Sequence, residues 1–400
     1  MPTASTPDDH AANLRNALVD SLVNKGSIVT PQVREAFASV PRHLFVPNVD
    51  VASAYADQPV FIRWDDGIPI SSSTQPTMMA IMAEQLHLEP GSRVLEIGAG
   101  TGYNAAVLAH IVGPGGSVVT VDIDQDIVDE AAGNLARAGY HDVEVVCGDG
   151  FAGHIPEQPY DRIMVTVGAQ DVSPHWVEQL QDGGIMVVPL WFRGYRVSVA
   201  LQKRDGLLES LSASPCMFIP IRGIADRNEG YYPIGDAKQD LPQTFVGMER
   251  DDPDRRRDLE RIFTQEVQSR EIRRSLQGQF HTHDLSSGLY MFLTIDPRIN
   301  IVHWETRENL FQGAGYALID LETMSAAVLA DGHPDRAMVY GGDAAYPELT
   351  RLLDRWDEMG RPSIHDLRIR ALSVSPPSIP EDNWVVAKRS AYTWVMSWDG

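Results

Sequence analysis

The stretch Val94-Leu-Glu-Ile-Gly-Ala-Gly-Thr-Gly-Tyr-Asn104 indicates the fold of this protein. It begins as an apolar run, turns through three glycines at alternate positions and continues into the helical pattern of Tyr103–Ile111. Glycine allows a sharp bend and a close approach of the backbone to a ligand, and a helix begins with free N–H groups. The stretch therefore predicts a strand, a ligand-binding turn and a helix, in that order.

A regular alternation of strands and helices continues after this turn. Short apolar runs predict strands, and amphipathic stretches predict helices. Alternating strands and helices are typical of a parallel, doubly wound sheet. The predicted strands are Arg93–Ile97, Ser117–Val121, Val143–Val146, Arg162–Val167, Ile185–Val188, Tyr195–Gln202 and Cys216–Ile221, and the helices among them are Tyr103–Ile111, Ile127–Ala138 and His175–Leu180.

The spacing of the glycines favours S-adenosylmethionine over a nicotinamide dinucleotide as the ligand. Gly98, Gly100 and Gly102 form G-x-G-x-G, whereas dinucleotide-binding turns have G-x-G-x-x-G. An acid, Glu96, lies two residues before the first glycine. S-adenosylmethionine has a cationic amine and sulfonium and no pyrophosphate to hold. A dinucleotide is the minor alternative.

Two acidic residues follow the next predicted strands. Asp122 ends the strand after the glycine-rich turn, where a carboxylate commonly accepts from both ribose hydroxyls; Asp124 is the less favoured candidate. Asp149, between Gly148 and Gly150, can accept from an adenine amino group. Alone, these acids are a solvated strand end and a plain turn. In this order they complete an S-adenosylmethionine site.

Composition excludes several classes of protein. The chain has 400 residues, 43% of them hydrophobic, and a formal charge of −22. It has no apolar run long enough to span a membrane, and its polar N-terminus predicts no secretory signal. The two cysteines, Cys147 and Cys216, fit a reducing, cytoplasmic location. The negative charge disfavours binding to nucleic acid or to anionic membranes.

A run of hydroxyl side chains precedes a predicted helix at residues 77–89. The segment Pro69-Ile-Ser-Ser-Ser-Thr-Gln-Pro-Thr77 ends the irregular region 41–76, which is long enough to be functional. Serine and threonine cap helices well. They also form a donor-rich cradle for an acceptor carboxylate. The residues alone favour neither interpretation.

Taken together, these motifs resemble the protein-L-isoaspartate O-methyltransferase family over residues 13–223. The resemblance implies a seven-stranded, Rossmann-like, S-adenosylmethionine-dependent methyltransferase fold, and a peptide or protein substrate bearing an aspartate or isoaspartate carboxylate. The matching stretches are Pro41-Arg-His-Leu-Phe-Val-Pro47, Ala54-Tyr-Ala-Asp57, Ser72-Ser-Thr-Gln-Pro76, Val94-Leu-Glu-Ile-Gly-Ala-Gly-Thr-Gly-Tyr103, Gly148-Asp-Gly150, Pro159-Tyr-Asp161 and Phe218-Ile-Pro220.

The resemblance also assigns site residues. Thr74 takes the position of a family serine that lies beside the methyl donor and the acceptor carboxylate. Arg222 follows a segment near the ligand, and we expect either a clamp on the acceptor carboxylate or an exposed surface arginine. The predicted cofactor-binding residues are Gln75, Thr77, Glu96, Gly98, Ala99, Gly100, Tyr103, Asp122, Ile123, Asp149 and Gly150. No metal is expected.

The chain continues well beyond this region. We expect a flexible leader at 1–12, a methyltransferase domain at 13–223, a linker at 224–258 and a smaller α+β domain at 259–400. Repair enzymes of the family end soon after the Phe218 segment, so the extension resembles longer relatives that modify lanthipeptides, lasso peptides or graspetides. The C-terminal domain is then expected to recognise a precursor peptide.

Several minor signals in the extension have plainer alternatives. His281-Thr-His283-Asp284 is a loose metal-like pattern without a second cluster. The arginines at 255–257 and 270–274 fit a solvated helix face better than a substrate-binding patch. The aromatic C-terminus fits a core strand better than a peptide-binding edge.

The predicted function is methylation of an aspartate carboxylate in a ring-constrained ribosomal peptide, followed by collapse of the ester to an aspartimide. The alternative within the family is repair of isoaspartate in damaged proteins. Two further alternatives are a non-catalytic S-adenosylmethionine-binding module and methylation of a small-molecule acid.

Overall fold

The computed structural model divides the chain into two compact units. It describes residues 7–156, 158–192, 195–224, 230–234, 243–248, 252–272, 288–306, 309–330, 335–373, 378, 384–388 and 391–398. Unit 1 comprises residues 1–190, 198–212 and 216–226, and unit 2 comprises 191–197, 213–215 and 227–400. One end of each of three long strands thus belongs to unit 2: β7 (Leu180–Phe192), β8 (Tyr195–Arg204) and β9 (Leu207–Pro215).

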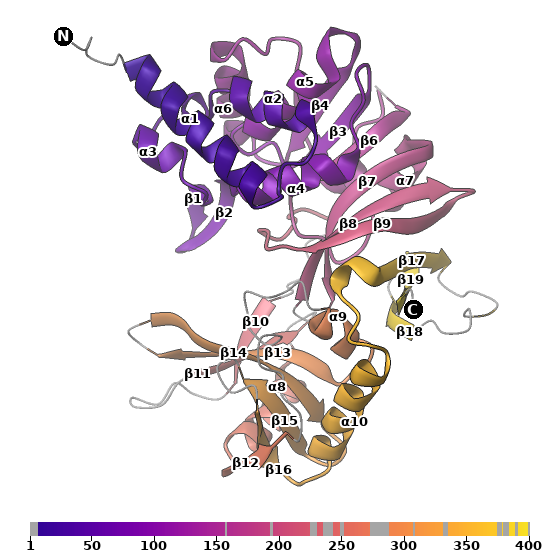
Figure 1. Ribbon diagram of the computed structural model, residues 1–400. Helices are drawn as coiled ribbons and strands as arrows, with labels where there is room; N and C mark the ends of the chain where they lie inside the picture. Colours follow the sequence, from indigo (N-terminus) through magenta and orange to yellow (C-terminus); the bar gives the residue numbers. More distant parts are fainter. Residues whose placement is uncertain are drawn as a thin grey trace. The chain divides into compact units, whose positions relative to one another are not determined.

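Unit 1 is built on a sheet whose strands follow the order β9-β8-β7-β6-β3-β4-β5 (Figure 1). Parallel pairing joins β5, β4, β3, β6 and β7 in that sequence, which confirms the predicted methyltransferase-like α/β fold. The strands are β3 (Arg93–Ile97), β4 (Ser117–Asp122), β5 (Glu144–Cys147), β6 (Tyr160–Val165), β7 (Leu180–Phe192), β8 (Tyr195–Arg204) and β9 (Leu207–Pro215).

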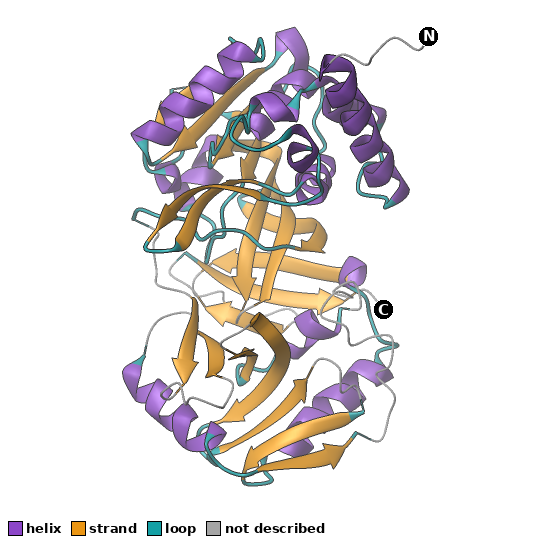
Figure 2. Cartoon of the chain, turned by 90° about the vertical axis from the view of Figure 1, so that its left-hand side faces the viewer, coloured by secondary structure: helices purple, strands orange, loops and turns teal. Residues whose placement is uncertain are grey.

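Helices lie on either side of the strands of this unit (Figure 2). Buried side chains of α1, α2, α4 and α5 form one hydrophobic core with the strands, because their apolar residues recur at helical spacing. The helices are α1 (Pro7–Asn24), α2 (Pro31–Ser39), α3 (Val51–Ala54), α4 (Pro76–Leu86), α5 (Tyr103–Val112), α6 (Gln125–Arg137) and α7 (Pro174–Gln179), with short 3-10 turns at η1 (Arg42–Leu44), η2 (Gly113–Gly115) and η3 (Gly150–Ala152).

Two local predictions for unit 1 were wrong. The region 41–76 is not irregular throughout, because it contains η1, α3 and an antiparallel hairpin of β1 (Val60–Asp65) and β2 (Ile68–Ser73). Cys216–Ile221 is not a strand. Instead β9 lies just before it, and residues 219–221 bind Gly168 through two backbone hydrogen bonds of 2.8 Å. The segment is apolar like a strand, but it pairs through this short bridge alone.

Unit 2 contains a seven-stranded antiparallel sheet in the order β10-β11-β13-β14-β15-β16-β12. These strands are β10 (Gly230–Ile234), β11 (Gln243–Met248), β12 (Val267–Glu271), β13 (Ile299–Thr306), β14 (Asn309–Asp320), β15 (Ser325–Ala330) and β16 (Arg336–Gly341). Three further strands pair in the order β18 (Trp384–Lys388), β19 (Tyr392–Trp398) and β17 (Leu367–Ser373). The helices are α8 (Pro253–Phe263), α9 (Leu289–Leu293), η5 (Ile364–Asp366) and α10 (Ala345–Glu358).

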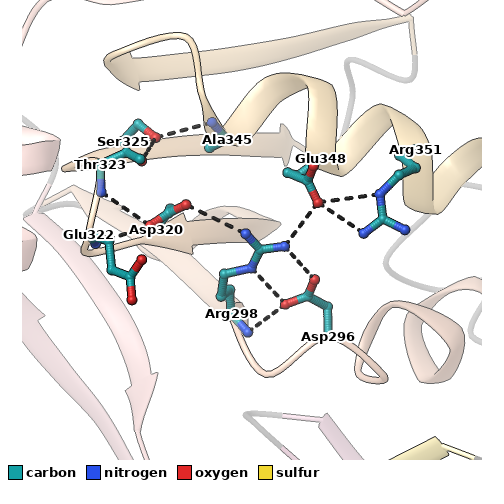
Figure 3. Close-up of polar contacts among 9 residues, drawn as sticks. All are labelled: Asp296, Arg298, Asp320, Glu322, Thr323, Ser325, Ala345, Glu348 and Arg351. Carbon is teal, nitrogen blue, oxygen red and sulfur yellow. Dashed lines mark hydrogen bonds and ion pairs between the residues drawn. The ribbon is translucent and has the colours of Figure 1, made fainter.

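Arg298 contacts several acidic side chains of this unit (Figure 3). Its guanidinium contacts Asp296 at 2.8 Å, Asp320 at 3.5 Å and Glu348 of α10 at 3.2 Å. Although partial burial opposes it, hydrogen bonding from Arg298 holds the pKa of Asp296 below its usual range. Arg298 thus connects Glu348 of α10 to Asp296 and Asp320, so we interpret this cluster as structural.

Several predicted features of the extension can be placed. Part of the predicted linker forms β10, β11 and the start of α8, and His281, His283 and Asp284 lie outside the described residues. Trp394 of β19 is fully buried, as a core strand requires. Among the described residues, no group of histidine, cysteine and acidic side chains could hold a metal ion, and no helix is long and apolar enough to cross a membrane.

Candidate active site

The glycine-rich turn connects β3 to α5 as predicted. Gly98, Gly100 and Gly102 have φ angles of +102°, +52° and +81°, which residues with a Cβ rarely adopt. Gly102 is the N-cap of α5 and lies against α6, where an added Cβ would approach Ala131 O to 3.1 Å. The turn therefore needs glycine for its backbone angles and for its close packing.

Thr166, the residue directly after β6, is hydrogen-bonded to this turn. Its hydroxyl donates to the carbonyl oxygens of Ile97 and Gly98, at 2.9 and 2.8 Å. A Cβ at Gly98 would lie 2.6 Å from the Thr166 hydroxyl oxygen. Sequence reasoning missed Thr166, because nothing in its own segment shows that β6 lies beside β3.

Asp122 faces the turn from the end of β4. It is 9% exposed, and its two carboxylate oxygens accept from the backbone N–H groups of Gly100 at 3.1 Å and Ile123 at 2.9 Å. Burial raises the pKa of Asp122, while these N–H groups and the Arg222 charge oppose that shift. Each carboxylate oxygen keeps a lone pair with which to accept from a ligand hydroxyl.

Glu96 lies inside the sheet rather than at the open end of the turn. It is fully buried, and its carboxylate accepts from Asn104 Nδ2 and Thr120 Oγ1, both at 2.6 Å. Desolvation raises its pKa to about 7, against the effect of these two hydrogen bonds. Glu96 thus ties β3 to β4 and to α5, and a direct cofactor role for it stays a prediction.

Asp149 is joined to the segment that follows the Phe218 stretch. Its carboxylate accepts from Phe151 N at 2.9 Å and from Ile224 N at 2.8 Å. Gly223 has φ +93°, and a Cβ there would lie 2.5 Å from the Asp149 carboxylate. Gly150 packs on Ile97, the last residue of β3. The predicted adenine acceptor therefore lies beside the glycine-rich turn, covered by residues 223–224.

Arg222 forms an ion pair with Asp124, the N-cap of α6. Both side chains are about one-third exposed, so neither interpretation of Arg222 is excluded. Its charge also reaches Asp122. A clamp on the acceptor carboxylate stays a prediction, and it requires Arg222 to share its guanidinium between Asp124 and the acceptor.

The helix that follows the hydroxyl-rich segment, α4, is capped by a residue distant in sequence rather than by the serines of that segment. Gln75 is the N-cap of α4 but makes no side-chain cap; its Nε2 donates to the Asp57 carbonyl at 3.1 Å. The Asp57 carboxylate instead accepts from Thr77 N at 2.9 Å and Thr77 Oγ1 at 2.7 Å. Asp57 therefore has the capping role, and contact of Thr74 with the acceptor stays a prediction.

These elements meet within unit 1. The Ser72 carbonyl of β2 lies 3.0 Å from where a Cβ on Gly100 would be, so the strand that leads into Thr74 touches the glycine-rich turn. Tyr103, the first residue of α5, has its ring 4.9 Å from the buried guanidinium of Arg42, which holds the Thr74 carbonyl. Ala99 is buried in the turn, and Ile123 N binds Asp122.

S-adenosylmethionine fits this arrangement. Asp122 and Asp149 are acceptors at neighbouring strand ends, as ribose hydroxyls and an adenine amino group require. The Ser73 hydroxyl is buried, 3% exposed, and has no hydrogen-bond partner in the described part of the chain. A buried hydroxyl without a partner calls for an explanation, and a bound ligand is one.

A glycine-rich turn and two strand-end acids on this sheet define an S-adenosylmethionine-dependent methyltransferase. Residues 13–226, more than half of the chain, match the family model of protein-L-isoaspartate(D-aspartate) O-methyltransferase. The chain belongs to this family and is a carboxyl O-methyltransferase of the isoaspartate type.

The chain is also similar in sequence to individual proteins of this family. The chain is 42% identical over 218 residues to a protein-L-isoaspartate O-methyltransferase of Hyperthermus butylicus, covering 52% of this chain and 88% of that protein. It is 44% identical over 211 residues to that of Methanopyrus kandleri, with 52% and 91% covered. A solved structure of a protein-L-isoaspartate O-methyltransferase aligns with a TM-score of 0.52 and 27% identity, covering 89% of this chain and 96% of that one.

Proposed function

We propose that this enzyme methylates an aspartate side-chain carboxylate in a ring-constrained ribosomal peptide. The observation that carries the proposal is the setting of Thr74. It follows the strand that touches the glycine-rich turn, and no described titratable side chain is hydrogen-bonded to its hydroxyl. A site without a general base suits an acceptor that needs none.

A carboxylate is such an acceptor, because its pKa of about 4 leaves it ionised at neutral pH. Bound S-adenosylmethionine supplies an electrophilic methyl group. The chain's own contribution is then positioning, which can supply a large part of a rate enhancement. Asp122 and Asp149 fix the donor end, and Thr74 donates its hydroxyl hydrogen to the acceptor oxygen that does not react. The hairpin β1–β2 and the segment 222–224 limit access of water.

The methyl ester accounts for the second stage. Methylation adds CH2 to the neutral acid. The next backbone nitrogen then attacks the ester carbonyl, its proton leaves with methoxide as methanol, and a succinimide closes. The net change is the loss of one water from the starting peptide. Hydrolysis of the ring returns that water and yields aspartate or isoaspartate.

Repair of isoaspartate in damaged proteins is the second candidate, and one observation favours it. A solved protein-L-isoaspartate O-methyltransferase aligns with 89% of this chain, so the C-terminal unit does not by itself indicate a peptide-tailoring enzyme. Thr74 supports the tailoring proposal, because its extra methyl group beside the acceptor changes the shape of the pocket relative to a serine.

Intact-mass analysis with S-adenosylmethionine tests the two candidates. One acceptor is a linear isoaspartyl peptide, and the other is a macrocyclised ribosomal peptide that contains an aspartate. Methylation followed by loss of one water, on the constrained peptide alone, supports tailoring. Methylation of the linear isoaspartyl peptide alone overturns it in favour of repair. Asp122→Asn is the matched inactive control, since it preserves the shape of the side chain and removes its charge.

A further inference from the structure

Arg42 is a fully buried arginine that binds backbone rather than acids. Its side chain is 0% exposed. Nε donates to the Ala54 carbonyl at 3.0 Å, and Nη2 donates to the carbonyls of Ser73 at 3.3 Å and Thr74 at 2.9 Å. One guanidinium therefore joins the end of α3 to the end of β2, one residue before the N-cap of α4.

The charge of Arg42 has no carboxylate hydrogen-bonded to it among the described residues. Its remaining contacts are Met79 Sδ at 3.6 Å and the face of the Tyr103 ring. Burial lowers the pKa of Arg42, and Tyr103 and the nearby Asp57 oppose that shift only through space. A buried charge without a paired acid is costly. A neutral side chain with N–H donors would satisfy these carbonyls without burying a charge, so a structural role alone explains this residue poorly.

The position of Arg42 also fixes the direction of two backbone N–H groups. The only cis peptide bond among the described residues precedes Pro159, so the peptides of Ser73–Thr74 and Thr74–Gln75 are trans. In a trans peptide the C=O and the N–H point in opposite directions. Since both carbonyls point at Arg42, the N–H groups of Thr74 and Gln75 point away from it.

The N–H groups of Thr74 and Gln75 are available to a ligand. Neither donates to an acceptor within the described ranges, whereas the next N–H of the segment, that of Thr77, is taken by Asp57. Two adjacent backbone N–H groups beside a hydroxyl form a donor set for a carboxylate. The overall charge of −22 repels an acidic acceptor, and the buried cation behind the segment offsets this locally.

We propose that Arg42 is a positioning residue for methyl transfer: it turns the Ser73 and Thr74 carbonyls inward, so that the N–H groups of Thr74 and Gln75 hold the acceptor carboxylate next to the Thr74 hydroxyl. This proposal rests on the carboxylate acceptor of the proposed function but not on the kind of peptide that carries it. Arg42 acts through the backbone and does not touch the substrate.

Arg42→Lys tests the proposal, because lysine keeps the charge and loses the planar fork that binds both carbonyls. Arg162→Lys is the matched control. Arg162 also binds backbone carbonyls of the α4 region, those of Leu86 and His87, but at the other end of the helix. Both variants are compared with the wild type for thermal unfolding, for S-adenosylmethionine affinity by calorimetry, and for kcat and KM of the acceptor that the wild type methylates.

We expect Arg42→Lys to lower kcat/KM for the acceptor by at least tenfold while the affinity for S-adenosylmethionine changes less than twofold. Arg162→Lys is expected to change neither by more than twofold, even where the unfolding temperature falls. A parallel loss of cofactor affinity and acceptor kinetics in Arg42→Lys would show a purely structural role and overturn the proposal. Unchanged acceptor kinetics in a folded Arg42→Lys would overturn it as well.

A binding measurement separates this proposal from the choice of acceptor. With selective 15N-threonine labelling, the Thr74 amide signal is followed while an isoaspartyl peptide is added to enzyme saturated with S-adenosylhomocysteine. A downfield shift in the wild type that is lost in Arg42→Lys supports the N–H cradle, whichever peptide is the physiological substrate. Binding of the peptide without a shift of Thr74 overturns the cradle and leaves the proposed function standing.

Discussion

The carboxylate of Asp57 caps helix α4 through Thr77, twenty residues further along the chain, with hydrogen bonds of 2.9 Å to the Thr77 N–H and 2.7 Å to its hydroxyl. Lys25 of the segment after α1 binds the same carboxylate at 2.7 Å. Three segments thus meet at Asp57, and one of them is the segment that contains Thr74, the residue expected to face the acceptor.

Asp57→Ala should therefore lower the free energy of unfolding by about 0.5–2 kcal/mol, the usual cost of replacing an N-cap acceptor with alanine. Partial burial raises the pKa of Asp57, but hydrogen bonds from Lys25 and Thr77 outweigh it and hold the value below the usual range. The contribution is present above pH about 4, the unfolded pKa, and is lost as the pH falls below it. Denaturant unfolding at pH 7 and pH 3 checks this, and an equal deficit of the variant at both pH values would contradict it.

Asp122→Ala should abolish S-adenosylmethionine binding in a folded chain, because the carboxylate is the acceptor beside the glycine-rich turn. Calorimetry measures the affinity, and circular dichroism checks the fold. Asp124→Asn is the neighbouring control, and it should weaken binding far less, since Asp124 pairs with Arg222. Unchanged affinity in Asp122→Ala would remove this residue from the site.

Glu96→Gln should change how stability depends on pH. In the folded chain the pKa of Glu96 is about 7, above its ordinary 4.5, so the folded state keeps a proton that the unfolded state has lost. The free energy of unfolding therefore falls as the pH rises from about 4.5 to about 7, by about 3 kcal/mol at most. The glutamine variant should lack this decline. Unfolding curves of the two proteins that run parallel from pH 5 to pH 8 would refute the assignment.

Gly98→Ala should be more destabilising than Gly139→Ala. Both glycines have a positive φ, +102° and +87°, so both substitutions strain the backbone. A Cβ at Gly139 meets nothing within 4 Å, whereas a Cβ at Gly98 lies 2.6 Å from the Thr166 hydroxyl oxygen. We expect a loss of about 1 kcal/mol at Gly139 and a further 1–3 kcal/mol at Gly98. Equal losses of unfolding free energy in denaturant titrations would mean that Thr166 moves away from the added Cβ at no cost, and would contradict the prediction.

Local sequence determined the strand, turn and helix at Arg93–Val112, the alternation that follows, and the identity of the acids at the strand ends. Each of these signals lies within its own segment of the chain. Hydrophobic period and glycine spacing report the backbone of their own segment, and a parallel sheet then brings the ends of its strands to one edge. The fold and the cofactor could therefore be predicted.

Only the tertiary structure decided which side chains support that site. Asp57 caps α4, Thr166 binds the Gly98 carbonyl, and Arg42 binds the Thr74 carbonyl. The Glu96 carboxylate accepts from Asn104 and Thr120. These partners are separated by between 8 and 68 positions in the chain. A hydrogen bond depends on distances of about 3 Å in space, and such distances are set by how distant segments pack, not by the spacing of residues along the sequence.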